Sequence, residues 1–199
     1  MEMEKLVDRV IRGIFVELEA SGRHVHVTKE QAVALFGHSL TPQRPLSQPG
    51  QFLSNERLTV KGPKGEFANV AVLGPERKAA QVEVSLTDAR TLGLTPPIRP
   101  SGSVENSPGA ELIGPKGSVH IDQGVIVAQR HIHMRPQDAV HFGVKDRQMV
   151  RLRTFTHRPV EFDDVLVRVD PGCATTVHLD YDEANACGFQ KGDLGRIIL

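Results

Sequence analysis

The sequence contains the pattern Arg-His-x-His twice, at residues 23–26 and 130–133, and this duplication constrains the fold more than any other feature. Side chains alternate between the two faces of a β-strand, so residues i and i+2 share a face. Each copy on a strand therefore presents two imidazoles on one side and turns Val25 or Ile132 to the other. Imidazole is the commonest neutral metal ligand, so each pair is half of a candidate zinc site.

The match between the two copies continues into the segments that follow them. Residues 28–37 and 135–143 both place Ala-Val and then Phe-Gly at corresponding positions, with one residue deleted in the second copy. Thr28 with Gln31 suits a helix N-cap, Pro136 suits a first helical turn, and the glycines suit helix ends. The duplication therefore predicts two similar half-structures, each a strand followed by a helix of about two turns, with a site between them.

Composition excludes several classes of protein. The 199 residues are enough to bury a core, and 24 basic residues balance 24 acidic ones, so nothing favours nucleic acid or an anionic membrane as partner. No apolar run approaches a membrane span, and the N-terminus lacks the order of a signal peptide. Two cysteines, Cys173 and Cys187, are compatible with a reducing compartment, so we expect a cytoplasmic protein.

Short alternating segments dominate the chain and are separated by Gly- and Pro-containing turns. Gly-Pro-Lys-Gly occurs at residues 62–65 and 114–117, each time between β-type segments, which is typical of a turn with proline at its second position. Many short strands and few short helices favour an all-β (mainly β) fold of two small β-barrel domains capped by short α-helices.

We expect the chain to divide into three parts. Residues 37–57 hold three prolines and little periodicity, which favours a lid-like insertion, although a solvated loop is the alternative. The expected parts are residues 1–22 plus 129–199 as the first barrel, residues 23–36 plus 58–128 as the second, and residues 37–57 as the insertion.

Each histidine pair needs a third donor to complete a zinc site. Glu83, in an alternating strand pattern between two valines, and His178, in a similar pattern, are the best candidates. Taken alone, Glu83 could instead be a solvent-facing strand residue. His178 could instead be a hydrogen-bonded strand histidine. Two sites of three protein donors, each with an open position, are typical of catalytic rather than structural zinc.

Two further residues suggest an anionic substrate. Arg77 lies in a charged loop after an apolar strand, and an arginine near two dications can bind phosphate or carboxylate with its planar fork. Ser101 can donate a hydrogen bond to an acyl or phosphoryl oxygen. The alternatives are a surface arginine and an ordinary turn serine. No Ser/His/Asp or Cys/His set and no glycine-rich nucleotide motif stands out.

Five segments together resemble phosphate propanoyltransferase, the PduL-type phosphotransacylase family of bacterial propanediol and related aldehyde-degrading pathways. The segments are residues 21–26, 72–77, 81–89, 99–102 and 124–134, and the resemblance extends to the C-terminus. It implies reversible acyl transfer between coenzyme A and inorganic phosphate, giving an acyl phosphate. It also implies two β-barrels with the active site between them, a dinuclear zinc centre with two zinc ions per chain, and a homodimer.

The resemblance also implies roles for individual residues. One zinc would be held by His24, His26 and Glu83, and the other by His131, His133 and His178. Arg77 would bind phosphate and Ser101 would assist catalysis. Three further residues would line the coenzyme A pocket: Ser21, Leu73 and Asn185.

The sequence leaves alternatives open for both the localisation and the reaction class of the protein. Residues 1–12 are expected to form an amphipathic helix packed on the body, or instead a peptide that docks on a bacterial microcompartment shell. Only about fifteen residues precede the first strand, which favours a free cytoplasmic enzyme over one in a microcompartment lumen. We expect direct attack by phosphate without an acyl-enzyme. A zinc-dependent thioester or ester hydrolase and a non-catalytic metal-binding module are the alternative functions.

Overall fold

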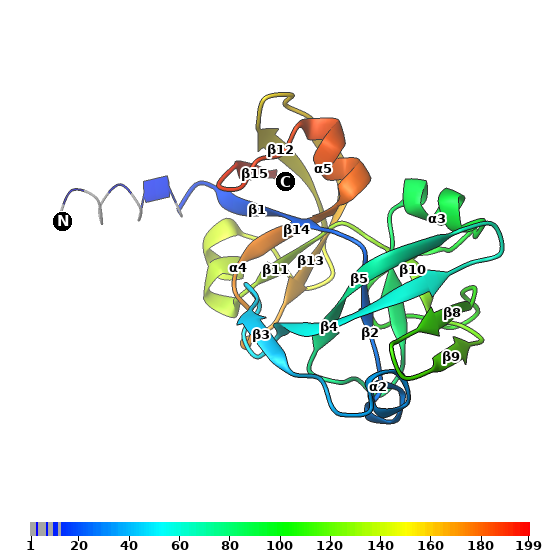
Figure 1. The fold of residues 1–199 in the computed structure, drawn as a ribbon. Helices are drawn as coiled ribbons and strands as arrows, with labels where there is room; N and C mark the ends of the chain where they lie inside the picture. Colours follow the sequence, from blue (N-terminus) through cyan, green and yellow to red (C-terminus); the bar gives the residue numbers. More distant parts are fainter. Residues whose placement is uncertain (1–2, 4–6, 8–9, 12) are drawn as a thin grey trace. The chain divides into compact units, whose positions relative to one another are not determined.

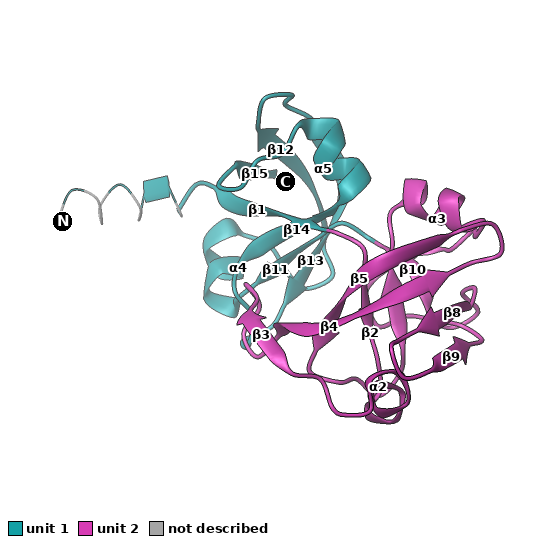
Figure 2. Cartoon of the chain, viewed as in Figure 1, with its two compact units in different colours: residues 1–21, 129–199 teal, residues 22–128 magenta. Residues whose placement is uncertain are grey.

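The computed structural model describes residues 3, 7, 10, 11 and 13–199, so the helix expected over residues 1–12 falls mostly outside the described part. The chain forms two compact units (Figure 2): unit 1 is residues 1–21 and 129–199, and unit 2 is residues 22–128. Within the described residues, no helix is both long and apolar enough to cross a membrane.

Unit 1 is a closed barrel of six strands in the order β1-β14-β11-β13-β12-β15 (Figure 1). The barrel closes because β1 and β15, the first and last strands in that order, pair antiparallel with each other. The strands are β1 (Val16–Ser21), β11 (His131–Met134), β12 (Met149–Phe155), β13 (Glu161–Val169), β14 (Thr176–Asp180) and β15 (Leu194–Ile198). From residue 13 onward, the helices of this unit are α4 (Pro136–Phe142) and α5 (Tyr181–Cys187).

Unit 2 is a curled half-barrel sheet of nine strands. Eight of them follow the order β7-β10-β6-β2-β5-β4-β8-β9, and the ninth, β3, pairs with β4 outside this order. Its first strands are β2 (His24–His26), β3 (Pro42–Pro45), β4 (Phe52–Lys61) and β5 (Glu66–Gly74). The others are β6 (Gln81–Glu83), β7 (Ile98–Arg99), β8 (Ala110–Ile113), β9 (Ser118–Ile121) and β10 (Val125–Ala128). The helices are α2 (Lys29–Phe36) and α3 (Leu86–Leu92). The predicted mainly-β class is confirmed.

The segment from residue 37 to 57 contains more strand than its composition indicates. β3 pairs antiparallel with β4 and begins and ends with proline, and all four of its residues are exposed. Proline donates no backbone hydrogen bond, so it is tolerated on an edge strand, where the period-2 pattern is weak because neither face is buried.

The helices after the two His-x-His strands begin and end as their residues predict. Thr28 caps α2 in a capping box with Gln31, and Pro136 occupies the first turn of α4. Gly37 and Gly143 end these helices in the left-handed conformation, with φ of 85° and 67°. Glycine alone adopts that region without a steric cost, so each helix stops at its glycine.

Each unit has its own apolar core, and the middle residue of each His-x-His strand lies in it. Val25 belongs to the core of unit 2 and Ile132 to that of unit 1, and both are fully buried. Burying such a side chain contributes roughly 1.5–3 kcal/mol. This burial fixes the opposite face of β2 and of β11 as the face that carries the histidines.

Candidate metal centres

Strand register brings a third donor opposite the first histidine of each pair. β6 runs antiparallel to β2 with Glu83 opposite His24, and β14 runs antiparallel to β11 with His178 opposite His131. Side chains directly opposite on one face of an antiparallel pair are close neighbours. Two clusters result, which we call the His-His-Glu cluster of unit 2 and the three-histidine cluster of unit 1.

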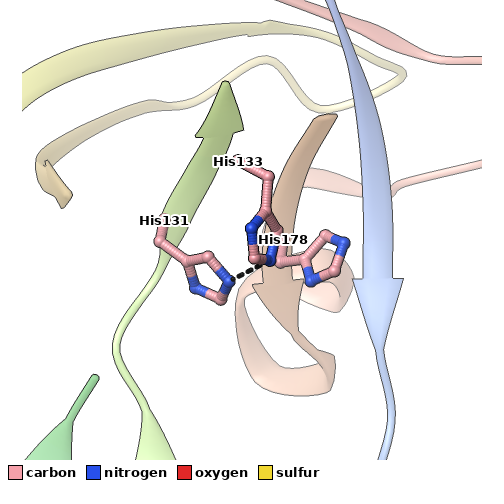
Figure 3. Close-up of side chains that lie close together, drawn as sticks. All are labelled: His131, His133 and His178. Atoms are coloured by element: carbon pink, nitrogen blue, oxygen red, sulfur yellow. Dashed lines mark hydrogen bonds between the residues drawn. The ribbon is translucent and has the colours of Figure 1, made fainter. Parts of the chain in front are cut away.

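In the three-histidine cluster, the rings converge from β11 and β14 (Figure 3). The Nε2 atoms of His131 and His133 lie 3.1 Å apart, and the His178 ring centroid is 5.1 and 4.8 Å from theirs. His131 Nδ1 lies 2.8 Å from the Gln129 carbonyl oxygen. A carbonyl only accepts, so this Nδ1 carries the proton, and Nε2 of the neutral ring keeps its lone pair for a metal.

A carboxylate from the neighbouring strand lies beside the third histidine. β1 runs parallel to β14 with Glu19 paired to His178, and Glu19 Oε2 lies 3.4 Å from His178 Nε2. That Nε2 is buried and makes no hydrogen bond of good geometry. A small movement of either side chain would let it hydrogen-bond to this Glu19 oxygen. The sequence analysis did not identify Glu19, because no motif surrounds it and only the pairing of β1 with β14 places it beside His178.

In the His-His-Glu cluster, both imidazoles are held by backbone carbonyls. His24 Nδ1 lies 2.8 Å from the Gly22 oxygen, and His26 Nδ1 lies 3.2 Å from the Leu73 oxygen. Both Nδ1 atoms therefore carry the proton, and both Nε2 lone pairs are available to a cation. Glu83 Oε2 lies 3.6 Å from His24 Nε2, and all three side chains are buried.

The electrostatics of this cluster favour a cation at its centre. Burial opposes ionisation of Glu83, but His24, His26 and the Ser101 hydroxyl hold its pKa well below the usual value. Burial and the adjacent His24 lower the pKa of His26 to about 2, so this ring is neutral and can ligate. Burial also opposes protonation of His24, yet the Glu83 carboxylate raises its pKa. The ionised Glu83 and the neutral His26 ring are in the protonation state that metal binding requires, whereas a metal at His24 would replace the proton that its raised pKa favours.

Both clusters fit a zinc-type ion by donor set and spacing. Within each cluster the donor atoms lie within 4.8 Å of one another. Two nitrogens at about 2.0–2.1 Å from a tetrahedral zinc are about 3.3–3.4 Å apart. The observed 3.1 Å between His131 and His133 is close to that spacing. Three protein donors leave at least one coordination position for another molecule, as in catalytic sites.

Arg77 and Ser101 lie together beside the His-His-Glu cluster. Arg77 Nη1 is 3.4 Å from Ser101 Oγ, and the Arg77 backbone N–H donates to the Val27 carbonyl at 2.8 Å. Ser101 Oγ donates to Glu83 Oε1 at 2.8 Å. Unit 2 thus brings a cation, a hydroxyl and three metal-type donors into one neighbourhood, which is suited to binding an anion next to a metal.

The three predicted coenzyme A residues lie in different elements. Ser21 is the last residue of β1 and pairs with Asp180, Leu73 is in β5, and Asn185 is an exposed residue of α5. Leu73 also supplies the carbonyl that holds His26, a backbone role that side-chain reasoning does not reveal. Their role in binding coenzyme A stays a prediction.

The arginine before each histidine pair has a structural role that the sequence did not indicate. Arg23 donates to Asp88 at 2.7 Å and lies 4.1 Å from the centre of the Phe67 ring. Arg130 donates to Glu183 at 2.7 Å and lies 5.6 Å from the centre of the Phe162 ring.

The two acids occupy the same position in their helices. Asp88 of α3 and Glu183 of α5 are each the third residue of a helix that begins with a capping box. Each arginine therefore ties the start of a His-x-His strand to a nearby helix start, so the two copies of the motif also share this contact.

The fold and its clusters define a mainly-β protein with two metal-type clusters, and comparison with known proteins specifies its family. The family model for phosphate propanoyltransferase matches residues 17–190. A phosphate propanoyltransferase of Clostridioides difficile strain 630 is 48% identical over 98% of this chain and 95% of the relative. One of Enterococcus faecalis is 50% identical over 98% and 97%. One of Leptotrichia buccalis is 54% identical over 90% and 86%. The chain belongs to the phosphate propanoyltransferase family and is an enzyme.

Proposed function

We propose that the protein transfers a short acyl group, propanoyl or acetyl, reversibly between coenzyme A and inorganic phosphate at zinc bound by its two clusters. The observation that carries the proposal is the pair of open three-donor clusters in a chain that the family model covers from residue 17 to 190. The family's name supplies phosphate and propanoyl as reactants, and the clusters supply a reason why such a reaction can proceed without a side-chain nucleophile.

Two zinc ions per chain are expected, one held by each cluster. The holding residues are His24, His26 and Glu83 in unit 2, and His131, His133 and His178 in unit 1. When bound, zinc would supply Lewis-acid charge that stabilises negative charge on the reactants. The protein's own contribution is to hold each donor in the correct tautomer through backbone carbonyls, as observed for His24, His26 and His131.

Arg77 binds the phosphate in this proposal. Ser101 assists by turning its single hydroxyl hydrogen, which Glu83 accepts in this structure, toward an acyl or phosphoryl oxygen. A phosphate oxygen attacks the thioester carbonyl carbon, the carbon–sulfur bond breaks, and the thiolate of coenzyme A leaves. The intermediate carries an oxyanion beside a phosphate dianion, so the guanidinium of Arg77 stabilises charge that increases along the reaction. Ser21, Leu73 and Asn185 contact coenzyme A. Holding both reactants together replaces an unfavourable bimolecular encounter.

Direct attack by phosphate agrees with the state of the two cysteines. Both Cys173 and Cys187 are buried free thiols, and burial raises the pKa of each above its usual value. A thiol of raised pKa is a poor nucleophile because little thiolate is present. A Cys173→Ser/Cys187→Ser variant should keep its activity. Loss of all activity in a variant that keeps its circular dichroism spectrum and zinc content would contradict direct attack.

The decisive assay is release of coenzyme A from several acyl-CoAs, with and without phosphate and with and without a chelator. We expect release to need both phosphate and metal, with acyl phosphate formed in equal amount. Equal release without phosphate would instead support a zinc-dependent hydrolase. Less than one zinc per purified chain, with full activity after chelation, would contradict the metal role. We further expect a homodimer that functions in the bacterial cytoplasm, to be checked by light scattering and cell fractionation.

A further inference from the structure

A fourth side chain completes the polar face that holds the His-His-Glu cluster. On the paired strands β2 and β6, His24 is opposite Glu83 and His26 is opposite Gln81. Gln81 and Glu83 are two residues apart on one strand, so they share a face. Gln81 is only 2% exposed, so its amide needs partners within the protein.

The Gln81 amide makes three hydrogen bonds around the cluster, two through its donor hydrogens and one through its oxygen. Its Nε2 donates to Glu83 Oε1 at 2.6 Å and to Ser101 Oγ at 2.8 Å. Its Oε1 accepts from the Gly102 backbone N–H at 2.7 Å. Only this orientation of the amide satisfies all three partners, since the Gly102 N–H needs an acceptor and the carboxylate needs a donor.

These bonds distinguish the two oxygens of Glu83. Oε1 accepts from both Gln81 and Ser101, whereas Oε2 is the oxygen that faces His24 Nε2 at 3.6 Å. Because two hydrogen bonds hold Oε1 in place, the carboxylate presents Oε2 to a metal in a fixed direction.

We propose that Gln81 is a positioning residue: it orients Glu83 as a one-oxygen metal ligand and ties that ligand to the Ser101–Gly102 turn. The inference rests on the proposed metal role of this cluster. It adds that ligand geometry and the position of Ser101 depend on one buried amide. Because Ser101 also contacts Arg77 at 3.4 Å, the same amide links the metal ligand to the residues proposed to bind the anion.

The other unit provides a matched comparison. At the corresponding corner of the three-histidine cluster, Thr176 lies opposite His133 and is also buried. Its hydroxyl donates to the Glu17 backbone carbonyl at 3.2 Å rather than to a ligand. Thr176→Val therefore removes a buried hydrogen bond beside a histidine pair without removing support for a ligand, and it serves as the control.

The test is zinc affinity measured on the full chain by competition with a chromophoric chelator. Gln81→Met keeps the length of the side chain and removes both donors and the acceptor. We expect one of the two zinc constants to weaken by about 10–100-fold, the usual effect of removing a group that supports a ligand. Thr176→Val should change both constants by less than about threefold. If Gln81→Met does not fold, Gln81→Asn withdraws the amide by one methylene and should show the same loss.

A double-mutant cycle separates positioning from a general structural role. In a Glu83→Ala background, Gln81→Met should cost less than about threefold in zinc affinity, because there is no ligand left to orient. An equal cost in both backgrounds, or unchanged zinc constants in Gln81→Met, would overturn the proposal. Absence of zinc binding by the unmodified protein would instead overturn the proposed metal role, so the two failures are distinguishable.

Discussion

Gly62→Ala tests whether the first Gly-Pro-Lys-Gly turn locks the end of a helix. The Lys64 backbone N–H donates to the Leu92 carbonyl at the end of α3 at 3.0 Å, and the turn closes through Gly62 N–H to the Gly65 oxygen at 2.9 Å. A Cβ on Gly62 would lie 2.4 Å from the Leu92 oxygen and 2.9 Å from its Cβ. Both distances are too short, so the turn must move away from the helix.

The magnitude follows from these contacts. Relief of the overlap costs about 1–3 kcal/mol, and loss of the Lys64–Leu92 hydrogen bond costs about 1 kcal/mol. We expect Gly62→Ala to lower the free energy of unfolding by about 2–4 kcal/mol, which shifts the midpoint of thermal unfolding by roughly 4–16 °C. The chain lacks tryptophan and has one tyrosine, so urea unfolding is best followed by far-ultraviolet circular dichroism.

Lys64→Ala is the matched control, because it keeps the backbone N–H and removes only the side chain that packs on Gly93. It should cost less than about 1 kcal/mol. The second turn gives an independent repeat: a Cβ on Gly114 would lie 2.3 Å from the Leu35 oxygen at the end of α2. If the free energies of unfolding of Gly62→Ala and Lys64→Ala differ by less than about 0.5 kcal/mol, the reasoning is refuted.

Three other predictions follow from individual contacts. Arg77→Ala should raise the KM for phosphate by about 10–100-fold, the value of a charged hydrogen bond, while zinc content stays unchanged; a parallel loss of zinc would contradict this. Glu19→Gln should weaken zinc binding about 10-fold through His178, its neighbour at 3.4 Å, and unchanged zinc constants would contradict this. Glu56 accepts two hydrogen bonds from Thr41; burial opposes its ionisation, yet these bonds hold its pKa below the usual value. The contribution of Glu56 to stability is therefore complete above its unfolded pKa of about 4.3 and is lost as the pH falls through the lower folded pKa. Glu56→Gln should be less stable than the unmodified protein by about 1–2 kcal/mol at pH 7, and this difference should shrink as the pH falls through the folded pKa, as measured by urea unfolding.

Much of the local structure could be predicted from the residues because it depends on neighbours a few positions apart. The alternation of His24, Val25 and His26 determined which side chains share a face, and Val25 is fully buried as expected. Thr28 and Gln31 determined a capping box, which the structure contains. Such interactions are made within one turn of helix or two residues of strand, so they need no knowledge of the remaining chain.

The site required the tertiary structure because its partners are far apart in sequence. Strand register decided that Glu83 lies opposite His24 and His178 opposite His131, and register is set by packing over whole sheets. Gln81 reads in sequence as one polar residue of an alternating strand, and only pairing with β2 places it at the cluster.

The duplicated Arg-His-x-His by itself determined two strands that each present a pair of histidines with a buried residue between them, and the capping residues after each copy determined the helices that follow. Only the tertiary structure decided what meets those histidines: a carboxylate in one unit, and a third imidazole with Glu19 beside it in the other. The physical reason is that alternation and capping are local, whereas a cluster of donors exists only where strands from distant parts of the chain pair in one register.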